Sequence, residues 1–106
     1  MNISYRRFEI LLPLRHNDGR RIRKRLVTET LVELRAQFGA SSCETQVIQG
    51  QWQHQGEIHH DELVRVFVDV EDLPGNRQFF LEFKESLKER FEQIDIWLTS
   101  HPIDVL

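Results

Sequence analysis

Two short stretches of the chain, residues 8–14 and 63–70, carry apolar residues on both faces of an extended strand. Strands of this kind belong at the centre of a sheet, because a strand with one wet face alternates between apolar and polar residues. In the second stretch, four valines share one face, and the other face carries Leu63, Arg65, Phe67 and Asp69. We expect the valine face to pack against helices and Phe67 to look the opposite way.

Each of these stretches precedes a segment with the period of an amphipathic helix. The first helix should follow the turn Asn17-Asp18-Gly19, whose Asn or Asp can cap it, and should end at Gly39. One face of it carries Leu26, Val27, Leu31, Leu34 and Phe38. The second helix should be capped by Asn76, and its buried stripe should be Phe80, Phe83, Leu87 and Phe91.

Two weaker strand patterns complete the set. Residues 43–53 are polar but tolerant of β structure and predict an edge strand, followed by a histidine-rich loop over residues 54–61. Residues 94–98 predict a last strand that His101-Pro102 ends. Its alternation places Trp97 outward, and the inward residues are Ile94, Ile96 and Leu98.

The order strand, helix, strand, strand, helix, strand is that of a split βαβ, or ferredoxin-like, domain of the α+β class. Right-handed crossovers then place both helices on one face of a four-stranded antiparallel sheet with strand order 4-1-3-2. The two most apolar stretches become the central strands. At 106 residues the chain fits one such domain, residues 1–106.

The layout from residue 40 onward resembles that of PII-type signalling proteins and CutA-type trimers, which build on a ferredoxin-like core. The matching pieces are residues 44–50, 64–72 and 95–98, the last leading into residues 103–106. The resemblance implies the fold alone. The nucleotide-binding glycines and basic residues of PII-type proteins have no counterpart here, so ATP and 2-oxoglutarate sensing is not implied.

The sheet face away from the helices is the main candidate for an interface or a ligand site. It should carry Leu11, Arg65, Phe67, Asp69 and Trp97, with Val47 or Trp52 beside them. A large exposed apolar patch usually marks a contact surface, so we expect a homo-oligomer, either a dimer or a small ring. The alternative is that loops and the C-terminal residues fold over the patch.

The histidine-rich loop is a candidate metal site. His54, His59 and His60 are accompanied by Glu57 and Asp61, and imidazole and carboxylate groups are good ligands for a zinc-like ion. The spacing matches no known ligand pattern, and neighbouring histidines point apart in an extended segment. A solvated polar hairpin tip explains the same residues.

The start of the first helix is strongly basic. Residues 1–25 hold eight of the fourteen Lys and Arg residues against two acidic residues, although the whole chain has a net charge of -3. Cations at a helix N-terminus oppose the helix dipole but favour a bound anion. Arg20, Arg21, Lys24 and Arg25 are therefore candidates for an anionic ligand, and a solvated helix start is the alternative.

No catalytic residue, reaction or cofactor is implied by the sequence. The single cysteine, Cys43, excludes an internal disulfide and a cysteine-built zinc site. The central strands lack the stacking aromatics of RNA-recognition domains, and the net charge is negative, so a nucleic acid partner is not expected. No apolar run is long enough to span a membrane, and no secretory signal is seen, which predicts a cytoplasmic protein.

These observations favour a small interaction or regulatory module, not an enzyme, that self-associates through its open sheet face. The alternative is a small-molecule-binding or enzymatic dimer with a site between that face and the histidine-rich loop. Such a site would use Arg65, Asp69 and Trp97 together with the histidines.

Overall fold

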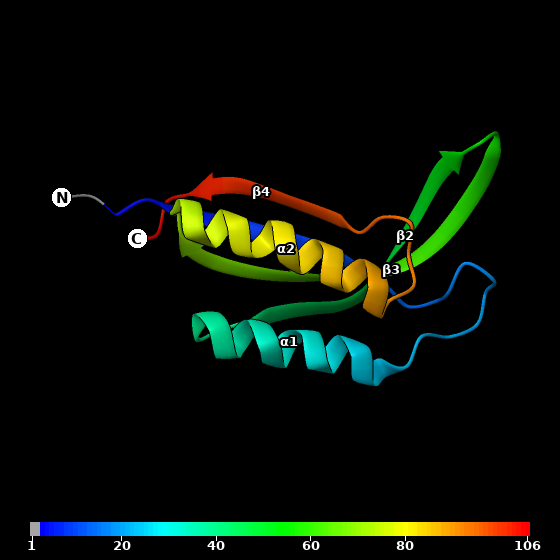
Figure 1. Cartoon of the computed structure of the whole chain (residues 1–106), viewed down its shortest axis with the longest axis horizontal. Coiled ribbons are helices and arrows are strands. Elements are labelled where there is room, and N and C mark those ends of the chain that lie inside the picture. The colour runs from blue at the N-terminus through cyan, green and yellow to red at the C-terminus, as the bar shows by residue number, and fades with distance from the viewer. Residues whose placement is uncertain (1–2) are drawn as a thin grey trace.

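The computed structural model describes residues 3–106 of the chain as one α+β unit. Strand β1 is followed by helix α1, the hairpin β2–β3, helix α2 and strand β4 (Figure 1). The bounds are β1 Tyr5–Pro13, α1 Lys24–Phe38, β2 Ser42–His54, β3 Glu57–Glu71, α2 Pro74–Arg90 and β4 Trp97–Ile103. No helix of the described chain is both long and apolar enough to cross a membrane.

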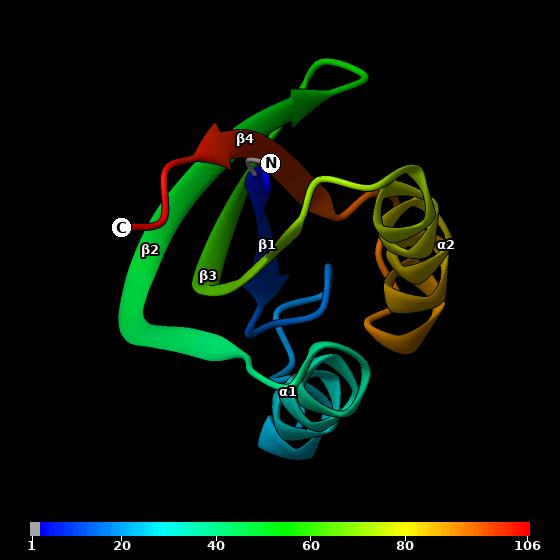
Figure 2. The same ribbon diagram turned by 90° about the vertical axis from the view of Figure 1, so that its left-hand side faces the viewer.

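The four strands form one antiparallel sheet in the order β2-β3-β1-β4. This is the predicted order 4-1-3-2 read from the opposite edge, so the ferredoxin-like topology is confirmed. Figure 2 shows both helices on the same side of the curved sheet. The other side, which we call the open face, is covered by no helix.

The valine face of β3 forms the middle of the core, as its pattern predicts. Val64, Val66, Val68 and Val70 are all buried, and so are Leu12, Ile10 and Phe8, the β1 partners of the first three. The apolar stripe of α2 covers these residues. Its buried members are Phe80, Phe83, Leu87 and, at the end of the helix, Phe91. The rings of Phe8 and Phe80 stack with their centroids 4.0 Å apart, which joins β1 directly to α2.

The β2–β3 hairpin differs from the prediction. The histidine-rich segment is not a loop, because β3 already begins at Glu57 and only Gln55 and Gly56 connect the strands. Both residues have positive φ, 50° and 81°, as a tight two-residue turn requires. The paired strands therefore continue past the ends of the helices, and the hairpin projects from the body of the molecule (Figure 1).

The helices begin at other residues than predicted. Helix α1 starts at Lys24 after Arg23, without a side-chain cap, and Asn17-Asp18-Gly19 forms a separate turn closed by the Arg15–Arg21 bridge. Helix α2 starts at Pro74, which fits proline's preference for the first helical turn. The Asn76 amide instead donates to the Glu71 carbonyl. The predicted stop at Gly39 is confirmed by its φ of 85°.

Strand β4 is shifted toward the C-terminus. It runs from Trp97 to Ile103 and includes Pro102, so His101-Pro102 does not end it. Proline is tolerated there because β4 is an edge strand with only one neighbour, β1. Ile96 is buried as expected, but Ile94 is exposed and lies before the strand.

Candidate functional site

The open face carries two clusters of paired charges beside its aromatic residue. Arg7 on β1 and Asp69 on β3 are register partners, and the guanidinium donates two hydrogen bonds to the carboxylate, of 2.7 and 3.0 Å. The same guanidinium lies over the ring of Phe67, 4.4 Å from its centroid. The three side chains make one continuous surface across the two central strands.

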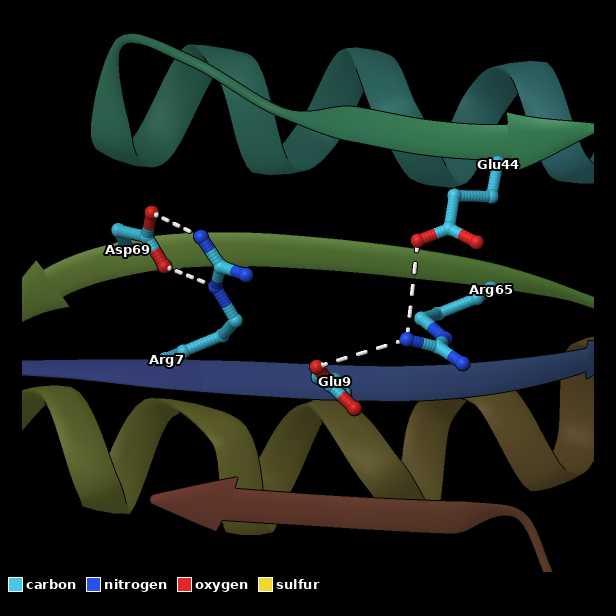
Figure 3. Close-up of polar contacts among 5 residues, drawn as sticks. All are labelled: Arg7, Glu9, Glu44, Arg65 and Asp69. Atoms are coloured by element: carbon cyan, nitrogen blue, oxygen red, sulfur yellow. Dashed lines mark hydrogen bonds and ion pairs between the residues drawn. The ribbon is translucent and has the colours of Figure 1, made fainter. Parts of the chain in front are cut away.

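The second cluster is centred on Arg65. Its Nη1 lies 3.6 Å from Glu44 on β2 and 4.0 Å from Glu9 on β1 (Figure 3). Figure 3 looks onto the open face, with both helices behind the sheet and the five charged side chains in front of it. Charged side chains on the open face thus connect β1, β3 and β2.

The ion pair of Arg7 and Asp69 shifts the pKa of both partners. The hydrogen bonds from Arg7 lower the pKa of the Asp69 carboxyl, and Asp69 raises the pKa of the Arg7 guanidinium. Both groups are therefore charged across the physiological range. The middle of the open face is a neutralised polar surface over a half-buried Phe67, and not the bare apolar patch that the sequence suggested.

The apolar part of the open face lies at the end near the hairpin and forms a groove of about 430 Å³. It is bounded by the end of β1, the base of the β2–β3 hairpin and the connection from α2 to β4. We call it the tryptophan groove. Its main lining residues are Leu11, Leu63, Trp52, Trp97, Asp61 and Asp95.

The two indoles of the tryptophan groove are held differently. Trp52 donates its Nε1 hydrogen to Asp61 over 2.6 Å, and its ring stacks on His59 with the centroids 4.4 Å apart. Trp97 is 65% exposed. One wall of the groove is therefore fixed by the hairpin, and the opposite side presents an open aromatic surface.

The five residues expected on the open face are divided between these two places. Leu11 and Trp97 line the tryptophan groove, and Phe67, Arg65 and Asp69 belong to the charged surface outside it. Asp61 was assigned by sequence to a loop, yet it lies in the groove because it pairs with Gly50 across the hairpin. The strand register would have located Asp61, but the histidine-rich composition of residues 54–61 led to the prediction of a loop without a register.

The three histidines are not brought together. His59 and His60 are neighbours within β3 and point to opposite faces of the hairpin, and His54 is the last residue of β2. Across residues 3–106 there is no group of three His, Cys, Asp or Glu side chains placed to hold a metal ion. The residues present do not fit the metal site that their composition suggested.

The basic segment is divided as well. Arg20 precedes α1 and is paired with Asp18 at 2.6 Å, and Arg25 is paired with Glu29 at 3.3 Å. Arg21 also precedes the helix, and Lys24 is its first residue. All four are exposed or nearly so, and only Lys24 and Arg25 lie in α1.

Cys43 lies at the start of β2 and is half-buried against the core. Burial, with the nearby charge of Glu44, raises the pKa of its thiol. A raised pKa leaves less of the nucleophilic thiolate, so this cysteine is a packing residue.

Comparison with known proteins shows the fold. No family model and no curated protein matches the sequence. Among solved structures, CutA from Synechococcus elongatus PCC7942 is similar, with a TM-score of 0.63 at 8% identity over 96% of this chain and 79% of that one. CutA1 from Oryza sativa gives 0.61 at 13% identity, over 97% and 83% of the two chains.

A phage SAM lyase, solved in complex with S-methyl-5'-thioadenosine, is also similar. Its TM-score is 0.68 at 14% identity, and the match covers 99% of this chain and 93% of that chain. The similarity of the layout to CutA-type proteins is therefore confirmed. The chain has a ferredoxin-like fold, which it shares with CutA-type proteins and the phage enzyme.

Proposed function

We propose that the chain is a small self-associating module, a homodimer or small ring, whose interface combines the open face with the projecting hairpin. The observation that carries this proposal is the hairpin, which extends past both helices (Figure 1). A two-stranded ribbon alone is at best marginally stable in water. A second copy of the chain would supply the missing cover.

Exposed apolar residues on both faces of this surface support the proposal. Trp97 on β4 and Val47 on β2 are exposed, and Ile58, which is 63% exposed near the hairpin tip, lies on the other face of the hairpin from Trp52. Residues of this kind are common in the centre of protein interfaces and unfavourable in water. The charged clusters of Arg7 and Arg65, in the middle of the open face, would meet the second copy as groups that are already paired.

Size-exclusion chromatography with light scattering tests this proposal directly. The mass of one chain is 12.7 kDa, so a dimer or trimer is easily resolved. We expect an oligomer at tens of micromolar protein. A particle of one chain mass across that range contradicts the proposal.

The tryptophan groove favours a second candidate function, the binding of a small molecule. Ligand sites are typically concave, mostly apolar and about 300–1,000 Å³ in volume, and the groove meets each condition. The structural likeness to a phage SAM lyase solved in complex with S-methyl-5'-thioadenosine adds a ligand class to try. No arrangement of side chains in the groove specifies a reaction.

A thermal-shift panel of nucleosides, nucleotides and metal ions tests this second candidate. A ligand bound only by the folded state raises the melting temperature by mass action. S-methyl-5'-thioadenosine belongs in the panel, with adenosine as its sulfur-free counterpart. An unchanged melting temperature with every member contradicts a ligand-binding role for these classes.

A further inference from the structure

We propose that the tryptophan groove binds a small aromatic cation, a flat ring that carries a positively charged group. This inference rests on the second candidate function and adds the chemical class of the ligand. It follows from the shape, the charge and the aromatic lining of the groove.

The shape suits a flat molecule larger than one inserted side chain. The groove holds about 430 Å³ between the hairpin and the start of β4. Gly50 and Leu63 both line it, and they pack closely, because a Cβ atom on Gly50 would lie 3.2 Å from the Leu63 side chain. Leu11 and Leu63 supply the apolar base against which a ring can pack.

The charge of the lining is negative. None of the residues that line the groove is Lys, Arg or His, whereas Asp61 and Asp95 both line it. Asp95 is neutralised by Lys84, whose Nζ lies 3.1 Å from its Oδ1. Within residues 3–106, Asp61 forms no ion pair, and its one side-chain hydrogen bond is the one that Oδ2 accepts from the Trp52 indole.

The aromatic lining favours a cation for a separate reason. The face of an indole attracts positive charge, and Trp97 presents an exposed indole beside the groove. A carboxylate together with an indole face is a combination that recognises organic cations and disfavours anions. The free oxygen of Asp61 is the atom we assign to the positive group of the ligand.

Three small molecules that share one ring but differ in charge test whether the groove selects a cation. Benzamidine is a cation at neutral pH, benzamide is its neutral counterpart of nearly the same shape, and benzoate is the anion. The chain has only two tryptophans, Trp52 and Trp97, and both line the groove. Their two indole N–H signals in a ¹⁵N NMR titration therefore report occupancy of the groove directly.

We expect benzamidine to move both indole signals saturably and to bind about tenfold or more tightly than benzamide, a preference of about 1.4 kcal/mol. Benzoate should leave the signals unchanged. Equal binding of all three would show that the groove takes ligands but does not select charge. Absence of any saturable shift overturns the assignment.

Substitution of the carboxylate completes the test. Asp61→Asn keeps an oxygen to accept the Trp52 hydrogen and should remove the tenfold preference for benzamidine. Asp69→Asn, a carboxylate on the same face outside the groove, is the matched control and should preserve it. Trp97→Leu should weaken benzamidine even if Asp61→Asn folds poorly.

An arginine of a second copy would present similar chemistry to the groove. If such an arginine occupies the groove, saturating benzamidine should dissociate the oligomer, and light scattering would detect the loss of mass. Such dissociation overturns the small-molecule assignment, and an unchanged oligomer with benzamidine bound supports it.

Discussion

The guanidinium of Arg7 lies over the Phe67 ring, 4.4 Å from its centroid, and at the same time holds Asp69 in a two-bond ion pair. One arginine thereby shields an aromatic ring and neutralises a carboxylate on the next strand. Phe67 is consequently the point at which apolar area and paired charge meet on the open face. Changes at these three residues separate the roles of the face in stability and in association.

Phe67→Arg should weaken self-association by tenfold or more if the open face is the interface. The new cation replaces a ring at its centre and lies beside Arg7 and Arg65, so it removes apolar contact and adds repulsion. Light scattering over a dilution series measures the shift toward the monomer. Circular dichroism checks that the fold is retained.

Val32→Arg is the matched control for that experiment. Val32 is an exposed apolar residue, but it lies on α1, on the opposite side of the sheet. We expect this variant to associate like the wild type. An oligomer that survives Phe67→Arg but is lost in Val32→Arg would place the interface on the helices.

The ion pair of Arg7 and Asp69 should stabilise the fold only above acid pH. The folded pKa of Asp69 is lowered by Arg7, so its contribution is full above the unfolded pKa of about 3.9 and is lost as the pH falls through the folded value. A double-mutant cycle with Arg7→Met and Asp69→Asn should give a coupling of about 0.5–1 kcal/mol at pH 7.

Urea unfolding of the four proteins at pH 7 and at pH 2.5 measures this coupling. The coupling free energy should be smaller at the lower pH. A coupling free energy that does not change with pH would contradict the assignment of this coupling to the charge of Asp69.

Leu87→Ala should destabilise the fold by about 2–5 kcal/mol, because the side chain is fully buried and its removal leaves a cavity. Leu81→Ala on the same helix is the control. Leu81 is 55% exposed, so its truncation should cost far less. Urea unfolding measures both, and similar losses would contradict the packing of α2 described above.

Polyanion binding, if the basic segment has this role, should depend on the residues without carboxylate partners. We propose that Arg21 and Lys24 carry it, because Arg20 and Arg25 are already paired with Asp18 and Glu29. The double variant Arg21→Gln with Lys24→Gln should therefore reduce heparin affinity and its salt dependence more than Arg20→Gln with Arg25→Gln. Equal losses of heparin affinity in the two double variants, or no loss in either, would contradict the proposal.

The core followed from hydrophobic periodicity, and the strand order followed from the order of the elements together with the right-handedness of crossovers. The four valines of β3 could face only one layer, and the phenylalanine stripe of α2 has the spacing to meet them. The hairpin connection was predicted, but the length of its strands was missed, because residues 54–62 are rich in charged and polar residues such as Glu and Asp that are depleted in strands. What decides its structure is the pairing of β2 with β3 and a Gln-Gly turn, whose strongest sequence form would be Asn-Gly.

The tryptophan groove could not be derived from any one segment. It brings together the end of β1, the hairpin and residues 93–97, which are far apart in the chain. Trp97 was correctly placed on the outer side of the last strand. The pairing of Trp52 with Asp61 required the hairpin register, which the predicted loop had removed.

Both borders of the sheet are poor templates for further strands. On one side, the pairing of β2 with β3 slips between Glu44 and Ile48, and on the other side Pro102 of β4 has no amide hydrogen to offer. Strand-by-strand growth into fibres is thereby disfavoured at each margin. Whatever assembly this protein forms should stop at a small, closed number of subunits.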